Sequence, residues 1–201
     1  MNECLITGMS NVGKTCFLIN FAEYMGLKQL KFHVKQVAGY TLINSYSPIE
    51  AREKLISVEK NSTKEVQTIN LEIPKGKTFK EIKIIDSCGL SEGIHPNKEI
   101  RLSMARTLQL IRESELVFHM IDLSTIKSGK EKILFTIDQM ILDYASVEKS
   151  YAILANKVDL NSGKQNIQLL KSKFKNITIL PISALYKTGF LDVKKMVFNY
   201  V

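Results

Sequence analysis

The sequence has few of the residues that mark specialised classes of protein. Three cysteines among 201 residues, without CxxC spacing, predict reduced thiols rather than a disulfide framework or a zinc site. Four prolines and ten glycines are too few for a collagen-like or a Pro/Gly-rich disordered chain, and no internal repeat is visible. The apolar runs are only about as long as strands, well short of the roughly 20 residues that span a bilayer. These absences leave one ordinary globular domain.

The N-terminal residues and the charge balance narrow the class further. Met1-Asn2-Glu3 lacks the basic stretch and the apolar region of a signal peptide, so we expect a cytoplasmic protein. The 28 Lys and Arg residues outnumber the 20 Asp and Glu residues, which gives a formal net charge of +8. Such an excess favours anionic partners such as nucleotides, RNA or an acidic membrane surface, without choosing among them.

Apolar runs of strand length alternate with helical patterns along the chain. Continuous runs of this kind are typical of parallel strands that are covered on both faces, and they occur at residues 4–7, 116–121, 151–155 and 177–182. Three apolar stripes at helical spacing lie between or after them: Ile100, Met104, Leu108 and Ile111; Ile133, Ile137, Met140, Ile141 and Tyr144; Val193, Met196, Val197 and Tyr200. The alternation predicts an α/β fold, a three-layer sandwich with ligands at the carboxyl ends of the strands.

The first half of the chain departs from this alternation. Residues 66–73 and 79–85 flank a Pro-Lys-Gly-Lys turn and therefore predict an antiparallel hairpin at the edge of the sheet. Residues 26–63 form a long connection, in which Ser47-Pro48-Ile49-Glu50 predicts the start of a helix over residues 51–58. A connection of this length indicates a functional or partly mobile segment.

A phosphate-binding motif follows the first apolar run. Residues 8–15, GMSNVGKT, match GxxxxGK[ST] between a strand and an amphipathic helix. In such a loop, backbone N–H groups and a helix N-terminus surround the β-phosphate, Lys14 reaches the β- and γ-phosphates, and the hydroxyl of Thr15 binds Mg²⁺. The residues that we expect to contact nucleotide here are Gly8, Ser10, Asn11, Val12, Gly13, Lys14, Thr15 and Cys16. The alternative, an ordinary Gly-rich turn, does not explain the strand and helix on either side.

A second motif, Asn156-Lys157-Val158-Asp159, comes directly after a buried run. A carboxylate at this point accepts hydrogen bonds from guanine N1–H and from the 2-amino group, whereas adenine has no donor at N1. The alternative for this tetrapeptide alone is a turn in which Asp159 or Asn161 caps a helix. Together with the phosphate loop, Asn156, Lys157 and Asp159 predict a guanine-nucleotide site.

Two shorter motifs gain their weight from position. Asp86-Ser87-Cys88-Gly89 ends the predicted hairpin, where Asp86 could hold a Mg²⁺-bound water and the Gly89 N–H could meet the γ-phosphate. Ser183, Ala184 and Leu185 end the last predicted strand, where their backbone N–H groups could contact guanine O6.

With these motifs in order from residue 4 to residue 200, the sequence resembles the P-loop GTPases of the translation-factor-related class, and within it the Era and Der branch. The resemblance implies a single G domain over residues 1–201, with five helices and a six-stranded, mostly parallel sheet that has one antiparallel edge strand. It implies that Thr63 is the switch I threonine, with Thr68 as the alternative. By the same resemblance, Thr15, Thr63 and Asp86 are metal-binding residues, and Lys14, Thr63 and Gly89 are catalytic ones.

The departures from this family pattern concern hydrolysis. Cys88 stands where the branch usually has proline, which suggests either a small buried spacer or a redox-sensitive thiol. Leu90 follows Gly89 where Ras-like enzymes have a glutamine that orients the attacking water, so hydrolysis needs help from elsewhere. Asn11 stands where potassium-stimulated relatives have an asparagine that binds K⁺; alternatively, it only stabilises the loop through local hydrogen bonds. His95 is expected in a solvated loop and His119 in the core.

Two functions are consistent with these residues. The first is a GTP-binding switch that slowly hydrolyses GTP to GDP with Mg²⁺, helped by a partner or by K⁺; the alternative is a guanine-nucleotide-binding scaffold with negligible hydrolysis. If the protein were an ATP-dependent enzyme, the guanine-recognition motif at residues 156–159 would have to be a chance match. Lys28, Lys31, His33 and Lys35 form a basic segment before switch I, which is either a solvated face or a partner surface. The expected partners are a protein or the ribosome and its RNA, with peripheral membrane contact and a nucleotide-dependent homodimer as further possibilities.

Overall fold

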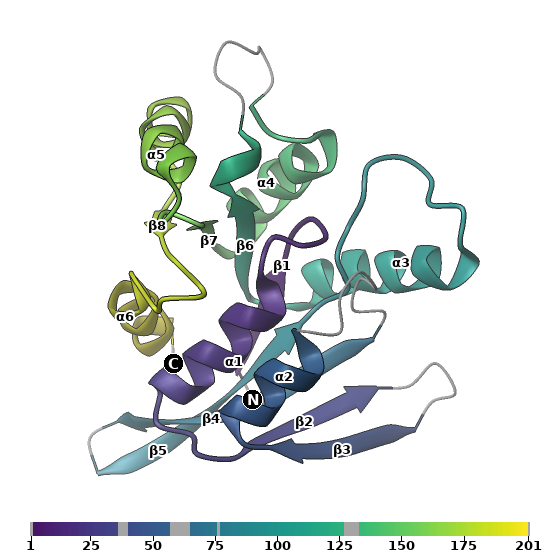
Figure 1. Ribbon diagram of the computed structural model, residues 1–201, viewed down its shortest axis with the longest axis vertical. Coiled ribbons are helices and arrows are strands. Elements are labelled where there is room, and N and C mark those ends of the chain that lie inside the picture. The colour runs from purple at the N-terminus through teal and green to yellow at the C-terminus, as the bar shows by residue number, and fades with distance from the viewer. Residues whose placement is uncertain (1, 36–39, 57–64, 76, 127–132, 201) are drawn as a thin grey trace.

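The computed structural model describes residues 2–35, 40–56, 65–75, 77–126 and 133–200. Its strands are β1 (Asn2–Thr7), β2 (Leu30–Lys35), β3 (Thr41–Tyr46), β4 (Val66–Lys75), β5 (Thr78–Asp86), β6 (Leu116–Asp122), β7 (Ser150–Asn156) and β8 (Ile179–Pro181). Its helices are α1 (Lys14–Tyr24), α2 (Pro48–Leu55), α3 (Lys98–Glu113), the 3₁₀ turn η1 (Leu123–Thr125), α4 (Thr136–Glu148), α5 (Asn161–Lys173) and α6 (Phe190–Tyr200). The strands form one sheet in the order β3-β2-β4-β5-β1-β6-β7-β8 (Figure 1).

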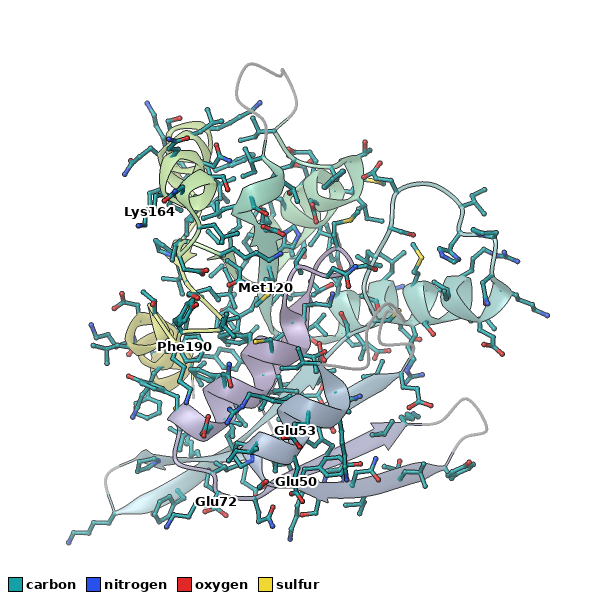
Figure 2. All side chains as sticks on the ribbon, viewed as in Figure 1. Glu50, Glu53, Glu72, Met120, Lys164 and Phe190 are labelled. Carbon is teal, nitrogen blue, oxygen red and sulfur yellow. The ribbon has the colours of Figure 1, made fainter. Side chains whose placement is uncertain are left out.

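The α/β sandwich that the sequence predicts is confirmed. β1 pairs in parallel with β5 and β6, and β7 pairs in parallel with β6 and β8. Apolar side chains of α1, α2 and α6 pack on one face of the sheet, while those of α3, α4 and α5 pack on the other. Phe190 at the start of α6 meets the Phe17 ring edge-on, with the ring centroids 5.2 Å apart (Figure 2). The apolar runs of the central strands are needed because both of their faces are covered.

The sheet has eight strands rather than the six expected, and six α-helices are described rather than five. The extra elements lie within residues 26–63, where β2 and β3 form an antiparallel hairpin and α2 follows. Alternation explains β2, because Leu30, Phe32 and Val34 face the core while the residues between them face outward. The antiparallel part of the sheet therefore comprises three pairings, β2–β3, β2–β4 and β4–β5, instead of one edge strand.

Helix α2 begins where the sequence predicts. The Ser47 side chain accepts a hydrogen bond from the Glu50 N–H, and the Glu50 carboxylate accepts one from the Ser47 N–H. This capping box and Pro48 at the first helical position fix the start of the helix.

Some expected helix faces are wrong in detail. Leu108 of α3 and Met140 of α4 remain exposed by 49% and 65%, whereas Asp138 of α4 is buried. For α4 the reason lies in β6 and β7: the buried ring of His119 is 2.8 Å from an Asp138 oxygen and 2.7 Å from the Tyr151 hydroxyl. A buried polar partner on the sheet turns the face of α4 that packs inward. Burial raises the pKa of Tyr151 far above its usual range, so the hydroxyl stays protonated. No described helix is long and apolar enough to cross a membrane.

Candidate guanine-nucleotide site

The phosphate-loop residues connect β1 to α1 and adopt unusual backbone angles. Asn11 has a φ of 63° and Gly13 a φ of 103°, both in the left-handed region. Alternating left- and right-handed residues turn successive N–H groups toward one concavity, which suits an anion. A Cβ at position 13 would lie 2.5 Å from Asn156 Nδ2, so only glycine fits. This loop therefore has both the shape and the close packing that phosphate binding requires.

The side chain of Lys14 is held under this loop. It is 7% exposed, and Nζ donates to the carbonyl oxygens of Gly8 at 3.2 Å and Met9 at 2.8 Å. Burial lowers the pKa of Lys14, while the nearby carboxyl of Asp86 opposes that shift. The ammonium is thus fixed in position before any ligand arrives, and a bound phosphate would supply the negative charge that favours its protonated form.

Thr15 and Asp86 meet beside the phosphate loop. Thr15 Oγ1 donates to Asp86 Oδ2 at 2.6 Å. The other oxygen, Asp86 Oδ1, is buried and has no hydrogen-bond partner among the described residues. Burial raises the pKa of Asp86 to about 6, against the lowering effect of Lys14 and of the Thr15 hydrogen bond. A hydroxyl with a buried carboxylate is the oxygen donor set that Mg²⁺ prefers, so these two residues fit a nucleotide-bound Mg²⁺.

The segment after Asp86 closes on the phosphate loop from the side. The Leu90 N–H donates to Gly8 O at 3.1 Å, and the Ser10 N–H donates to Leu90 O at 2.9 Å. A Cβ at Gly89 would lie 2.5 Å from Ser10 Oγ and 2.7 Å from Ser10 Cα, so a larger residue would separate the two segments. Leu90 is fully buried. Its side chain belongs to the core rather than to the phosphate site, where a water-orienting group would be needed.

Cys88 is buried as well, which fits the spacer interpretation rather than the redox one. Burial raises the pKa of the Cys88 thiol, so its reactive thiolate is disfavoured. The Cys88 carbonyl accepts a hydrogen bond from Thr107 Oγ1 of α3 at 3.2 Å. This contact ties helix α3 to the loop beside the phosphate site.

Asn156 links the base-recognition motif to the phosphate loop. Its Nδ2 donates to Val12 O at 2.7 Å, and its Oδ1 accepts from the Ala184 N–H at 2.9 Å. One buried side chain thereby holds together three loops that are far apart in the sequence. Asp159 follows on the same loop, and its carboxylate has no hydrogen bond or ion pair among the described residues. The loop that carries Asp159 is therefore tied to the phosphate loop through Asn156.

The backbone of residues 183–185 is partly engaged within the protein. The Ser183 N–H donates to Thr188 O at 3.1 Å, and the Ala184 N–H is taken by Asn156. Among the three amides, that of Leu185 has no partner in the described structure, which makes it the donor best placed for a base carbonyl. Asn20 of α1 holds the loop from below, because its Nδ2 donates to Ala184 O at 2.7 Å.

Other residues that build the site were not found from the sequence. Asp122, at the end of β6, pairs with the Lys157 ammonium and accepts from the Ser124 N–H at 2.8 Å. The Asn20 side chain also accepts from Arg52 at 2.8 Å and so connects the site to α2. The available signals were weak: a carboxylate at a strand end for Asp122, and one polar residue within an apolar helix for Asn20.

The remaining expected site residues are placed as follows. Thr63 lies outside the described residues. Thr68 lies within β4 rather than in a loop, and its Oγ1 donates to His33 O at 3.4 Å. The exposed Asn11 side chain forms no hydrogen bond to the described residues, so the local bonds considered above are not seen there. Cys16 is half-buried beside Asn20, 3.5 Å from its Nδ2. His95 is in an exposed loop, as expected, and His119 in the core.

Comparison with known proteins agrees with this geometry. Residues 3–157 match the model of a family described as 50S ribosome-binding GTPase. The chain belongs to this family of P-loop GTPases. Curated relatives include the GTPase Obg of Mycoplasmopsis synoviae, 27% identical over 59% of this chain and 28% of the relative, and that of Bacillus mycoides, 28% identical over 65% and 31%. The chain thus spans less than a third of the length of these relatives.

Solved structures support the same fold. Aquifex aeolicus Era bound to GDP and AlF₄⁻ aligns with a TM-score of 0.61 and 17% identity, over 100% of this chain and 56% of Era. Era in complex with MgGDPNP and nucleotides of 16S ribosomal RNA aligns with a TM-score of 0.58 and 17% identity, over 99% and 56%. The cytosolic domain of L. pneumophila FeoB gives 0.58 and 17%, over 98% and 69%. The likeness to Era and to the GTPase class that the sequence indicates is confirmed at the level of family and fold.

Truncating the side chain that joins the three loops should weaken both stability and binding. We expect Asn156→Ala to lower the free energy of unfolding by about 3 kcal/mol, because the Val12 carbonyl and the Ala184 N–H lose their buried partner. GDP affinity should fall in parallel. Thermal unfolding and GDP titration measure the two effects, with the exposed Asn199→Ala of α6 as the control. Unchanged values in Asn156→Ala would contradict the joining role.

Proposed function

We propose that this protein is a GTP-dependent molecular switch that binds GTP with Mg²⁺ and hydrolyses it slowly to GDP. The observation that carries the proposal is the position of Asn156, which connects the Lys14 loop to the loop of Asp159. A single nucleotide can then place its phosphates on the first loop while its base meets the carboxylate. Membership of the GTPase family and the Obg relatives support the same conclusion.

The described residues have separable roles in this mechanism. Lys14 neutralises charge on the β- and γ-phosphates, and the loop amides hold the phosphate oxygens in place. Thr15 and Asp86 would hold Mg²⁺, which supplies charge neutralisation on the same oxygens when it is bound. Water attacks the γ-phosphorus, the bond from that phosphorus to the bridging oxygen breaks, and GDP and inorganic phosphate form. Gly89 packs against Ser10 of the phosphate loop, and its N–H is the donor that we assign to the γ-phosphate.

Slow hydrolysis is expected because the residue after Gly89 has no polar side chain. Leu90 is buried and its backbone is bonded to the phosphate loop, so it supplies no polar side chain to the attacking water. The same observation favours the second candidate function, a guanine-nucleotide-binding scaffold with negligible turnover. A dependence of hydrolysis on a monovalent cation would distinguish the switch from the scaffold. The oxygen of the exposed Asn11 carboxamide is available to bind such a cation.

Phosphate release in potassium chloride and in sodium chloride of equal ionic strength tests this proposal. We expect turnover of GTP in both salts, at least about tenfold faster in K⁺, since a cation near the phosphates offsets developing negative charge. Asn11→Gly should abolish the K⁺ stimulation because it removes the carboxamide, while glycine tolerates the left-handed backbone at this position. Asn11→Asp should retain it, because the oxygen ligand remains.

The controls distinguish a lost cation site from a damaged loop. GDP affinity of Asn11→Gly should stay within about twofold of the wild type, because glycine relieves rather than adds backbone strain. Turnover indistinguishable from background in both salts would reject the switch and favour the scaffold. Stimulation by K⁺ that persists in Asn11→Gly would reject the cation role of Asn11 alone.

The partner that reads the nucleotide state is proposed to be ribosomal RNA or a ribosomal protein. The family description, the Era complex with 16S ribosomal RNA nucleotides and the net charge of +8 support this choice. Thr63 remains the proposed switch I residue, and its ordering by Mg²⁺ and γ-phosphate would expose or hide the partner surface. Membrane contact, a homodimer and a cytoplasmic location remain predictions from the sequence.

A further inference from the structure

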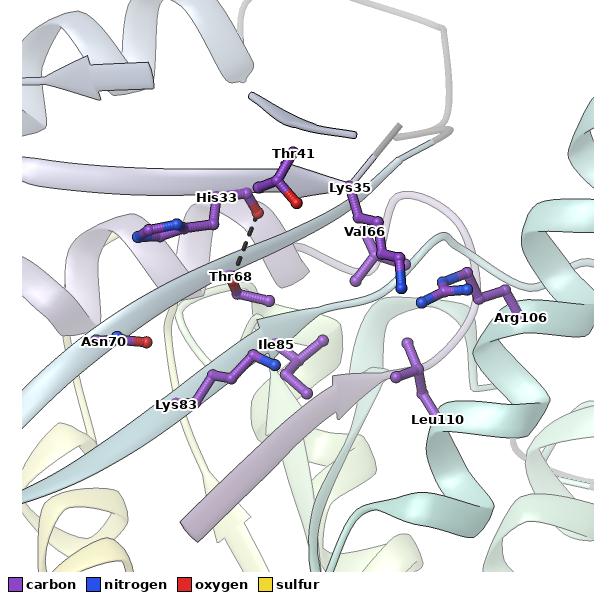
Figure 3. A pocket seen from close by; sticks show the side chains of 10 residues that line it. All are labelled: His33, Lys35, Thr41, Val66, Thr68, Asn70, Lys83, Ile85, Arg106 and Leu110. Atoms are coloured by element: carbon purple, nitrogen blue, oxygen red, sulfur yellow. Dashed lines mark hydrogen bonds between the residues drawn. The ribbon is translucent and has the colours of Figure 1, made fainter. Parts of the chain in front are cut away.

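A second cavity lies on the sheet, apart from the guanine-nucleotide site. Its volume is about 350 Å³, and it lies between the strands β2, β3, β4 and β5 and helix α3 (Figure 3). The residues that line it are His33, Lys35, Thr41, Val66, Thr68, Asn70, Lys83, Ile85, Arg106 and Leu110. None of them belongs to the phosphate loop or to the base-recognition motifs.

The additional hairpin β2–β3 builds one side of this cavity. Because Phe32 and Val34 face the core on the α1 side, His33 and Lys35 project from the opposite face of the sheet. The register places His33 beside Thr68 and Lys35 beside Val66. Three lining residues therefore come from the two strands that a six-stranded G domain would not have. The cavity therefore depends on the two strands that the sequence did not predict.

The walls of the cavity are positively charged. Lys35, Lys83 and Arg106 line it, and none of the ten lining residues carries a carboxylate. Lys83 is partly compensated, because its Nζ is 3.0 Å from an oxygen of Glu3. Lys35 and Arg106 have no ion-pair partner among the described residues, and Figure 3 shows their charged ends directed toward one another. Two like charges that face each other across a concave site create a positive potential that an anion relieves.

The floor of the cavity has a different chemistry from its walls. Val66, Ile85 and Leu110 are buried apolar residues at its base. Thr41, Thr68 and Asn70 add neutral hydrogen-bonding groups. An apolar floor beneath cationic walls suits a ligand that has a flat or apolar body and an anionic group. The volume is also in the range of small-molecule sites, which start at about 300 Å³.

We propose that this cavity binds a small organic phosphate, a ligand with a ring or other apolar body and a phosphate group. The guanidinium of Arg106 presents paired N–H donors that match phosphate oxygens, and the ammonium of Lys35 approaches from the opposite wall. The body of the ligand packs on Val66, Ile85 and Leu110. The site does not depend on GTP hydrolysis, so it can be tested in protein held in its GDP form.

AMP is the probe, because it has a ring and one phosphate and because its adenine does not match the carboxylate of Asp159. It is titrated into the 201-residue protein saturated with GDP and Mg²⁺, and backbone amide NMR shifts are followed. We expect saturable shifts at Thr68, Lys83 and Ile85 with no displacement of GDP. Adenosine and inorganic phosphate, which each lack one half of the ligand, should bind at least about tenfold more weakly.

Two variants of α3 form a matched pair. Arg106→Gln should weaken AMP binding at least about tenfold, because it removes a charge-assisted contact. Arg112→Gln, which makes the same change of charge six residues further along α3 and outside the cavity, should stay within about twofold. If both variants weaken AMP binding equally, the loss is explained by the lower net charge of the protein, and the proposal is overturned.

Further outcomes bear on the nature of the ligand. AMP shifts centred on Asp159 and Leu185, or displacement of GDP, would place the probe in the nucleotide site and overturn the proposal. Tighter binding per site of a ten-nucleotide oligoadenylate than of AMP would assign this surface to RNA and also overturn it. Thermal unfolding shows whether each variant is folded. If Arg106→Gln does not fold, the titration of the wild-type protein with AMP, adenosine and inorganic phosphate still decides the proposal.

Discussion

Replacing Lys14 by alanine is expected to reduce GTP affinity and turnover by at least about 100-fold, the loss seen when one preorganised electrostatic donor is removed. The ammonium is already fixed by the carbonyl oxygens of Gly8 and Met9, so it needs no reorganisation when the phosphates arrive. Without it, the γ-phosphate charge has no protein cation beside it, and these two carbonyls lose their donor. Fluorescent-nucleotide titration and phosphate release measure the two losses.

A measurement of stability shows whether the loss of GTP affinity in Lys14→Ala is caused by unfolding. Burial lowers the pKa of Lys14, which means that burying the charged amine is itself unfavourable in the nucleotide-free protein. Its removal should therefore leave that protein folded, as thermal unfolding and circular dichroism would show. Lys164→Ala, at an exposed position of α5, is the control and should keep wild-type affinity. If Lys14→Ala binds and hydrolyses GTP as the wild type does, residues 8–15 are not the phosphate-binding loop.

Replacing Asp159 by asparagine is expected to change the preferred base. The carboxylate accepts from both N1–H and the 2-amino group of guanine, whereas an amide places a donor against that amino group. GTP affinity should fall by roughly 10²–10⁴, because one charge-assisted hydrogen bond is lost, the other is no longer charge-assisted, and two donors are brought together. Xanthine carries a carbonyl oxygen at position 2, so the amide can donate to it while still accepting from N1–H. XTP should then bind Asp159→Asn more tightly than GTP does.

Competition between GTP, XTP and ATP measures this preference directly. The control is Asp192→Asn on α6, whose side chain is 61% exposed and pairs only at the surface with Lys195. It should leave the order of the nucleotides unchanged. Preference of the wild-type protein for ATP, or an unchanged preference for GTP in Asp159→Asn, would contradict the role given to this carboxylate.

Much of the central sheet was predictable because its strands are covered on both faces. Such strands must be apolar throughout, and β1, β6 and β7 are therefore visible as continuous runs. The half-exposed hairpin of β2 and β3 was not found, because Lys31, His33 and Lys35 interrupt the apolar residues of β2. Alternation over six residues is a weak signal inside a long connection. The sheet was accordingly expected to be two strands smaller than it is.

The faces of α4 show a second limit of sequence patterns. The spacing of Met140 and Tyr144 predicted a buried stripe, yet both are exposed, and Asp138 is buried beside His119. A helix rotates to satisfy a buried polar group on the sheet, since an unpaired one costs more than exposing a methionine. The sequence pattern of α4 carries no information about where His119 of β6 lies relative to the helix.

The sequence alone identified the two loops to which we assign phosphate and base recognition, because GMSNVGKT and NKVD specify their backbone and side-chain groups within a few consecutive residues. The tertiary structure decided how those loops meet: the bond from Asn156 to Val12 joins residues 144 positions apart and depends on the order of the strands. It also decided that Leu90 is core and that the β2–β3 hairpin encloses a cationic cavity. Motif chemistry is local in the chain, whereas burial and enclosure arise only between segments that folding brings together.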